Sequence, residues 1–119
     1  MTDKEKIEQL VDAEQYMILA VTLDDGTPWV VPVKLQAHDS YRTLEWDSRL
    51  DTIHSEALMA RPNMAVTIFR KEADRQTGFY ATGTAERVEA RGEYGRYRFT
   101  AAEAWINDET FVKRKVELS

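Results

Sequence analysis

Hydrophobic and polar positions change their spacing several times along the chain, and these changes predict a series of short elements. Residues 3–13 carry Ile7, Leu10 and Val11 at helical spacing, directly after the capping-box sequence Thr2-Asp3-Lys4-Glu5. Residues 16–23 and 27–35 are apolar runs of strand length, joined by the hairpin-forming pair Asp25-Gly26. The first third of the chain therefore predicts a helix followed by a β-hairpin.

The rest of the chain predicts further short elements. Strands are expected at residues 43–46, 63–69, 78–88 and 110–118, and a helix at residues 51–61 that Arg61-Pro62 would close. Gly83 inside a strand is typical of a bulge, and Pro28 and Pro32 indicate an edge strand. Residues 37–42 form a polar stretch, residues 71–77 a charged loop, and residues 92–105 a loosely helical segment.

These elements predict a mainly β fold with two or three short helices. Helices are too sparse among about six strands for a doubly wound parallel sheet, so a six-stranded antiparallel barrel is the better prediction. The length of 119 residues suits one domain over residues 1–119.

Composition and charge exclude several classes of protein. Without cysteine the chain has no disulfide scaffold and no thiolate nucleophile, and a formal net charge of −5 is unsuited to nucleic acid. No apolar run approaches the about 20 residues that span a bilayer, and residues 1–10 do not resemble a signal peptide. We therefore expect a cytoplasmic protein that does not act at a membrane.

One segment could carry chemistry, although Walker, GxGxxG, GxSxG and HExxH motifs are absent. Trp46-Asp47-Ser48 ends a predicted strand, and Asp51-Thr52-Ile53-His54 opens a predicted helix. A helix start attracts anions through its unpaired amides, and Arg49 or His54 could add positive charge. Simple helix capping is the alternative, since the Asp51 carboxylate could occupy the same amides.

A family resemblance supports the anion site. It rests on the segments Met17–Val21, Asp25–Val33, Trp46-Asp47-Ser48 with His54, Arg61–Val66 and Gly83–Glu86, in that order and spacing. Together they resemble the pyridoxamine 5′-phosphate oxidase-like family, whose fold is the FMN-binding split barrel. The match covers about residues 15–89.

The resemblance implies a cofactor site and a partner. Val30, Val31, Pro32 and Val33 would lie along the flavin ring, and Ser48, Thr52 and His54 would anchor its phosphate with help from Arg49. Trp46, Asp47 and Ile53 would line the same groove. The expected assembly is a homodimer with FMN at the subunit interface, acting as an oxidoreductase on a small molecule that the sequence does not identify.

Several positions depart from the family pattern. Val31 and Ile53 stand where the founding oxidases have phosphate-binding arginines, Gly78 replaces a polar contact, and Pro32 lacks an amide hydrogen. The chain also ends without those oxidases' extended C-terminal segment, so pyridoxamine phosphate oxidation is not expected. We identify no catalytic side chain. The alternatives are a deazaflavin, a haem held by His54 or His38, or a cofactor-free binding or stress-response protein.

Overall fold

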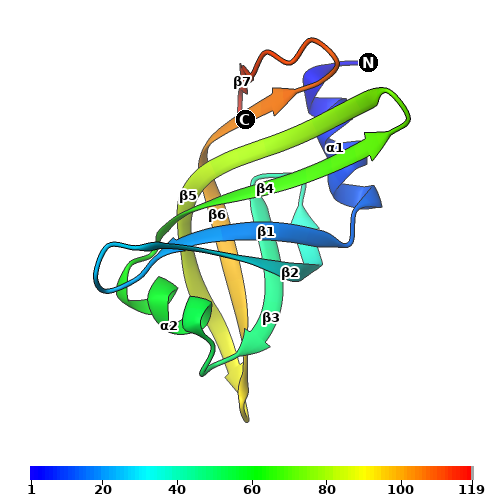
Figure 1. The fold of residues 1–119 in the computed structure, drawn as a ribbon. Helices are drawn as coiled ribbons and strands as arrows, with labels where there is room; N and C mark the ends of the chain where they lie inside the picture. The colour runs from blue at the N-terminus through cyan, green and yellow to red at the C-terminus, as the bar shows by residue number, and fades with distance from the viewer. Residues whose placement is uncertain (119) are drawn as a thin grey trace.

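A computed structural model describes residues 1–118, and it consists of one antiparallel sheet with two helices (Figure 1). The seven strands of these residues pair in the order β3-β2-β1-β4-β5-β6-β7, and an additional β3–β6 pairing closes the first six into a barrel. The predicted six-stranded antiparallel barrel is confirmed, with β7 as a short addition beside β6. The elements are α1 (Asp3–Ala13), β1 (Tyr16–Thr22), β2 (Pro28–Asp39), β3 (Thr43–Arg49), α2 (Ile53–Ala60), β4 (Asn63–Glu72), β5 (Arg75–Arg91), β6 (Tyr94–Asn107) and β7 (Arg114–Val116).

The barrel is split between β2 and β3. β2 pairs with β1 from Pro28 to Lys34, but it meets β3 only from Leu35 onward, with a bulge between Leu35 and Ala37. On β3, the segment after Trp46 pairs with β6 alone. The first half of β2 therefore has one edge without a strand partner in residues 1–118.

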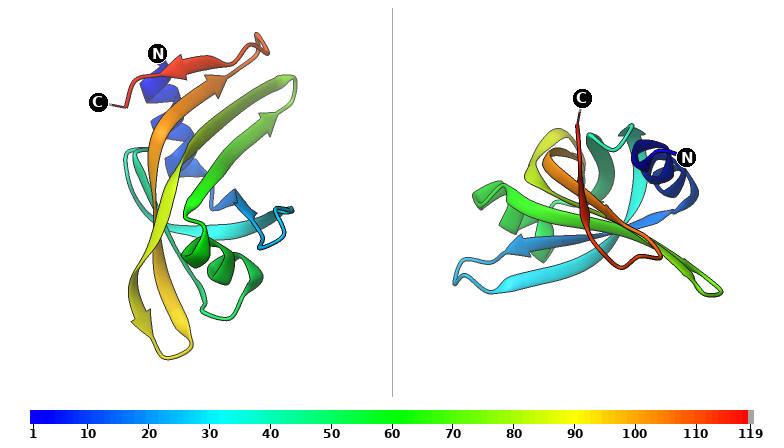
Figure 2. Two further views of the ribbon diagram at one scale, coloured as in Figure 1. Left: turned by 90° about the vertical axis from the view of Figure 1, so that its left-hand side faces the viewer. Right: turned by 90° about the horizontal axis from the view of Figure 1, so that it is seen from above.

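The two helices close the two ends of the barrel (Figure 2). α1 begins with the predicted capping box, in which Thr2 and Glu5 each accept a hydrogen bond from the other's backbone amide, and it buries Ile7, Leu10 and Val11. α2 begins at its N-cap Thr52 and ends at Arg61, before Pro62. Both predicted helices are confirmed within two residues of their expected bounds.

Alternation along the strands builds the core. On β6, Gly95, Tyr97 and Phe99 are buried, while the intervening arginines are partly exposed. Trp46 on β3 is fully buried, and its ring is 5.8 Å from that of Tyr97 with the two planes 20° apart. Large aromatic side chains therefore fill the part of the barrel beside the split.

Two sequence interpretations are wrong. Residues 92–105 are not helical but belong largely to β6, because burial there has a period of two. Residues 71–77 are not a loop: β4 and β5 continue to a tight turn where Ala73 has a φ of 49°. The polar stretch at residues 37–42 belongs partly to β2, which runs to Asp39. The bulge predicted at Gly83 is confirmed by a register shift between Thr82 and Gly83.

None of the helices in residues 1–118 is long and apolar enough to cross a membrane.

Candidate functional site

A cluster of small polar side chains lies where β3 leads into α2. Ser48 is the last inward-facing residue of β3, and its Oγ lies 3.0 Å from Nε2 of His54. Thr52 Oγ1 caps the helix by accepting from the Ser55 amide at 3.1 Å, and it donates to Ser55 Oγ at 2.7 Å. The same Thr52 oxygen lies 3.4 Å from His54 Nε2. The structure thus brings the three predicted phosphate anchors, Ser48, Thr52 and His54, into one hydrogen-bonded cluster.

Burial changes what this cluster can do. Ser48 is 9% exposed, His54 is 8% exposed and Ser55 is fully buried. Burial lowers the pKa of His54 below its ordinary value of 6.5. The imidazole is therefore neutral at pH 7, and it contacts Thr52 as a hydrogen-bonding group rather than as a cation.

Arg49 is not a spare cation, contrary to the sequence interpretation. Its Nε and Nη2 donate to the two carboxylate oxygens of Asp51 at 3.1 and 3.2 Å, and its Nη1 donates to Glu93 at 3.2 Å. Because the Asp51 carboxylate binds this guanidinium, it does not compete with Thr52 for the backbone amides at the start of α2. The helix start is therefore capped as in the simple-capping alternative, but by Thr52 and not by Asp51.

The unpaired edge of β2 is the second part of the candidate site. Proline has no amide hydrogen for a neighbouring strand, so Pro28 and Pro32 suit the positions whose backbone groups point away from β1. By the same alternation, the amide and carbonyl of Val30 also point to that free edge. The free edge therefore presents backbone carbonyls at Pro28, Val30 and Pro32 but an amide at Val30 alone, because Pro28 and Pro32 have no amide hydrogen.

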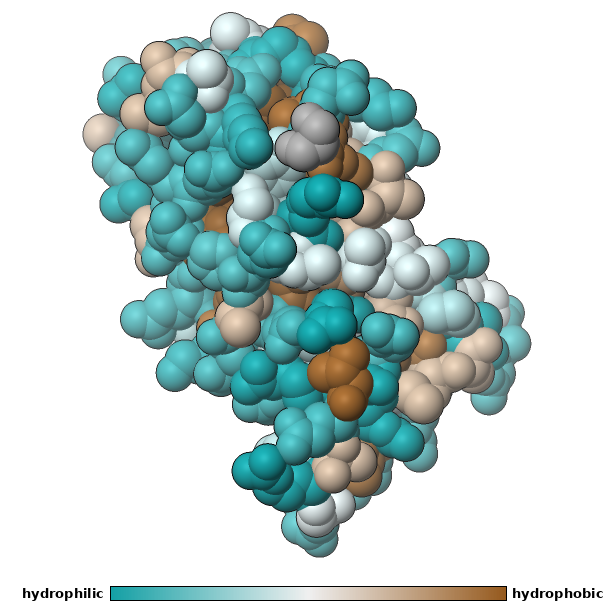
Figure 3. Space-filling view, turned by 180° about the vertical axis from the view of Figure 1, so that it is seen from behind, coloured by the Kyte–Doolittle hydropathy of each residue, from teal (hydrophilic) through white to brown (hydrophobic). Residues whose placement is uncertain are grey.

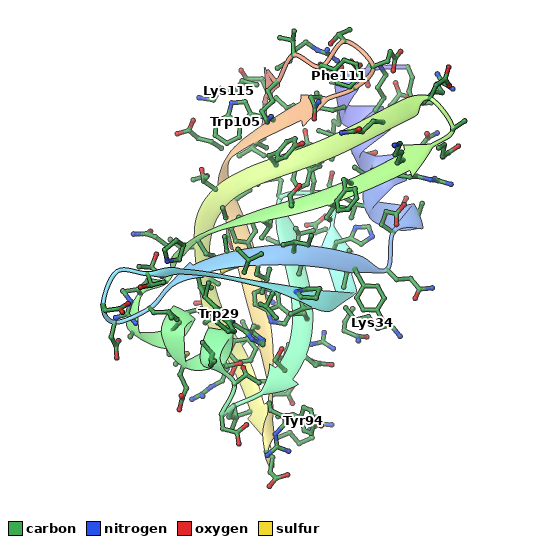
Figure 4. All side chains as sticks on the ribbon, viewed as in Figure 1. Trp29, Lys34, Tyr94, Trp105, Phe111 and Lys115 are labelled. Carbon is green, nitrogen blue, oxygen red and sulfur yellow. The ribbon has the colours of Figure 1, made fainter. Side chains whose placement is uncertain are left out.

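The side chains of this segment point to two sides. Val31 and Val33 pack toward the core, whereas Val30 is 62% exposed and Pro32 is also exposed. Trp29 lies near α2, as its label in Figure 4 shows. Of the four predicted residues, only Val30 and Pro32 therefore present backbone groups to the free edge, whereas those of Val31 and Val33 point to β1.

Trp46, Asp47 and Ile53 do not line one groove. Trp46 is fully buried inside the barrel, while Asp47 lies on the outer face and accepts hydrogen bonds from Arg96 at 2.5 and 3.2 Å. Ile53 is exposed at the first position of α2. Trp46 Nε1 and Tyr97 Oη are buried without a hydrogen-bond partner in residues 1–118. Two buried polar atoms close to Ser48 in the fold, one of them on the same strand, thus lack a hydrogen-bond partner.

Two hollows of the single chain lie elsewhere. One of about 300 Å³ lies between α1 and the β4–β5 hairpin, and it is lined by Lys6, Arg70 and Arg75 among others. Another of about 600 Å³ lies beside Tyr94 and Arg96 on the outer face of the sheet. Neither contains Ser48, His54 or a β2 residue. Of the predicted cofactor residues, these two hollows therefore include only Asp47.

Sequence reasoning missed Glu93 and Ser55 at this site. Glu93 lies in the turn between β5 and β6, and its backbone oxygen accepts from the Leu50 amide at 2.9 Å. No local signal links residue 93 with residue 50, because the contact follows from the β3–β6 pairing, which places Arg49 opposite Tyr94. Ser55 is different: a serine three residues after Thr52 could have been recognised as a capping partner.

The donor set at the split matches the chemistry of a flavin. The carbonyls of this edge and the Val30 amide can accept from and donate to the nitrogens and carbonyls at the rim of a flavin ring. The start of α2 adds the helix dipole, which suits a phosphate, although the Thr52 hydroxyl hydrogen is already donated to Ser55 Oγ and Arg49 is already paired. The ring end is therefore held mainly through backbone acceptors, and the phosphate end depends on few groups.

Comparisons with known proteins agree with this fold. Residues 3–118 match the family model described as pyridoxamine 5′-phosphate oxidase. No curated protein sequence matches the chain.

Among solved structures, a protein related to general stress protein 26 from Clostridium acetobutylicum superimposes with a TM-score of 0.81 at 13% identity, covering 98% of this chain and 97% of that one. A FAD-binding protein from Mesorhizobium loti gives a TM-score of 0.76 at 14% identity, covering 91% of this chain and 95% of that one.

A haem-binding protein from Mycobacterium smegmatis gives a TM-score of 0.85 at 12% identity and covers 98% of this chain. This chain spans only 58% of that protein's length. Identities this low show a shared fold, whereas the family match extends over nearly the whole sequence. The chain therefore belongs to the pyridoxamine 5′-phosphate oxidase family.

Proposed function

We propose that the protein is an FMN-binding oxidoreductase whose flavin ring lies along the free edge of β2. The observation that carries this proposal is the unpaired edge from Pro28 to Lys34, which opens beside the polar cluster at the start of α2. A backbone edge binds a heterocycle through hydrogen bonds without needing particular side chains. This explains how the site could work although Val31 and Ile53 carry no charge.

Within this proposal, the chain's residues bind and orient the cofactor. The backbone of Val30 and its neighbours holds the ring, and Thr52 with the first amides of α2 faces the phosphate. Ser48 and His54 fix Thr52 in place through the contacts described above. The bound flavin would supply the redox chemistry, and the protein its position and electrostatic surroundings. The small-molecule substrate remains unidentified.

We also propose a homodimer, with the second copy covering the front of the sheet. Five residues from five neighbouring strands stand side by side in register, and we call them the uncharged row: Pro32, Ile18, Thr67, Tyr80 and Trp105. All five are at least partly exposed. The opposite face in Figure 3 is largely hydrophilic, with only separated hydrophobic spots. The row itself carries no charge, although the Lys113 ammonium lies 4.6 Å from the centre of the Tyr80 ring, and it begins beside the candidate flavin edge, which suits a subunit interface that completes the site.

Haem is a weaker candidate for this chain, because both histidines have other partners. His54 Nε2 lies within hydrogen-bond distance of Ser48 in the interior. His38 contacts the Ser40 carbonyl through Nδ1 at 3.1 Å and Asp12 through Nε2 at 3.0 Å. An axial haem ligand needs a free and accessible ring nitrogen, so one His38 contact would have to break, and His54 is only 8% exposed. The single-domain organisation and the cytoplasmic location remain predictions.

A titration of the purified full chain with FMN tests the proposal. We expect FMN fluorescence to be quenched, and the variant Val30→Glu to weaken binding at least about tenfold, because it sets a carboxylate beside the ring edge. Val112→Glu is a matched control, since Val30 and Val112 are equally exposed at 62% and Val112 lies in the C-terminal segment. Absence of quenching in the unmodified protein, or equal losses in the two variants, would contradict the proposal.

A further inference from the structure

The tip of the β5–β6 hairpin reaches the candidate phosphate end of the site. Figure 1 shows this hairpin extending beyond the barrel next to the loop between β3 and α2, and Figure 4 shows Tyr94 at its tip. The Leu50 amide donates to the Glu93 carbonyl oxygen at 2.9 Å, which fixes the hairpin backbone to this loop. A residue distant in sequence is therefore held beside the start of α2.

At this point one guanidinium is shared by two carboxylates. Asp51 binds Arg49 through both carboxylate oxygens, whereas the Glu93 side chain contributes a single hydrogen bond at 3.2 Å. The Arg49 guanidinium carbon also lies 5.9 Å from the centre of the Tyr94 ring. One positive and two negative charges leave this group with a net negative charge, which repels a phosphate dianion.

The two carboxylates differ in how readily a phosphate could replace them. Asp51 is two residues from Arg49 and holds it with a two-pronged contact, which is the stronger geometry. The Glu93 carboxylate is well exposed, with a side-chain exposure of 75%, and makes one bond. Its departure would not release the hairpin, because the Leu50–Glu93 backbone bond does not involve the side chain.

We propose that Glu93 competes with the flavin phosphate for Arg49, and that it thereby sets the preference of the site for phosphorylated over unphosphorylated flavin. Three of the five guanidinium N–H groups of Arg49 are already used, and the Glu93 carboxylate both occupies Nη1 and offsets the positive charge that a phosphate would meet. Glu93 is thus a specificity-determining residue that acts through Arg49. This inference rests on the proposed flavin site and adds how that site distinguishes phosphorylated from unphosphorylated flavin.

The test measures dissociation constants for FMN and for riboflavin by fluorescence titration of the full chain. Glu93→Gln should tighten FMN binding by about 3- to 10-fold, because it removes a competing charge, and leave riboflavin binding unchanged. Arg49→Gln should weaken FMN binding about tenfold, again without a change for riboflavin. In the double variant, Glu93→Gln should no longer have an effect, because the group for which it competes is gone.

The matched control is Glu89→Gln. Glu89 lies on the same hairpin and pairs with Arg91 rather than Arg49. Its replacement by glutamine therefore removes the same charge without changing the contacts of the shared guanidinium. If both glutamine variants gained FMN affinity equally, general charge repulsion would explain the gain, and the proposed competition for Arg49 would be overturned. An unchanged or weaker FMN affinity in Glu93→Gln would overturn it as well. Failure of the unmodified protein to bind either flavin would instead overturn the proposed function.

Discussion

Thr52 is the single side chain on which the start of α2 depends most. Its hydroxyl oxygen accepts from the Ser55 amide and lies within hydrogen-bond distance of Ser55 Oγ, His54 Nε2 and the Arg49 carbonyl. One oxygen thus links the helix cap, the buried imidazole and the preceding loop. The main role of the neighbouring residues is therefore to fix the position of this hydroxyl, and contact with a ligand is secondary.

His54 predicts a measurable dependence of stability on pH. Because burial lowers its pKa in the folded state, the unfolded chain binds this proton first as the pH falls below 6.5. The free energy of unfolding should therefore decrease toward acid, by at most about 1.4 kcal/mol per pH unit for this group. The contribution is fully present above pH 6.5 and is lost as the pH falls. Urea unfolding between pH 5 and pH 8 would measure it.

Two variants separate His54 from the other titrating groups. His54→Gln keeps a side chain that can hydrogen-bond Ser48 but cannot titrate, so its stability should fall less steeply than that of the unmodified chain below pH 6.5. His38→Gln, which leaves His54 and its contacts in place, is the matched control. Parallel profiles for the unmodified chain and His54→Gln would show that the imidazole does not titrate in this range.

The elements show which parts of the fold the sequence could predict. α1 and the first hairpin follow from local signals: the capping box at Thr2, and Asp25-Gly26, where Gly26 has the positive φ of 89° that glycine favours. β6 was mistaken for a helix because Tyr94 and Tyr97 are three residues apart, whereas burial follows Gly95, Tyr97 and Phe99. Only the strand partners of β6 decide between the two patterns, and they lie far away in the sequence.

The candidate site divides in the same way. Sequence and family resemblance grouped Ser48, Thr52 and His54, because they lie within seven residues of one another. The charge state of His54 and the pairing of Arg49 could not be predicted. Burial and the contact with Glu93 determine them, and both arise from the closed barrel.

The contact between α1 and the C-terminal segment predicts a large effect from one carboxylate. Asp108 is almost fully buried and accepts hydrogen bonds from Lys6 at 3.1 Å and from Arg114 at 2.9 Å. The hydrogen bond from Arg114 is the main cause that holds the pKa of Asp108 well below its usual range. Asp108→Asn should therefore lower the free energy of unfolding by about 2 kcal/mol, measured by urea unfolding at pH 7.

Asp3→Asn is the control for this prediction. Asp3 also binds Arg114, but its side chain is 36% exposed, whereas that of Asp108 is 6% exposed, so its loss should cost less. Stability due to Asp108 is present above pH 3.8 and is lost as the pH falls below that value, so Asp108→Asn should also flatten the acid limb of the profile. Equal costs for both variants would indicate that the burial of Asp108 has no energetic consequence.

At the scale of the whole molecule, the proposed interface at the uncharged row is tested by measuring the oligomeric state. Ile18 is the second residue of the row, between Pro32 and Thr67. If a second copy covers this face, the unmodified protein should have twice the 13.8 kDa mass of one chain, as measured by light scattering after size exclusion. Ile18→Arg should then give the mass of a single chain, because it would bury an unpaired charge at the interface.

Thr100→Arg is the corresponding control. Thr100 is an exposed strand residue that lies opposite Thr84 and Thr43 and outside the row, so this variant should keep the dimer mass. A single-chain mass for the unmodified protein, or dissociation by both variants, would contradict an interface centred on the row.

The ion pair between Asp3 and Arg114 also bears on the order in which the protein can fold. It joins positions 111 residues apart, at 2.9 Å between Arg114 Nη2 and Asp3 Oδ1. The entropic cost of closing so long a loop is compensated only when the barrel between the two ends has already formed. On a ribosome, residue 114 is made long after α1. The first helix to be synthesised is therefore expected to be among the last elements to lock into place.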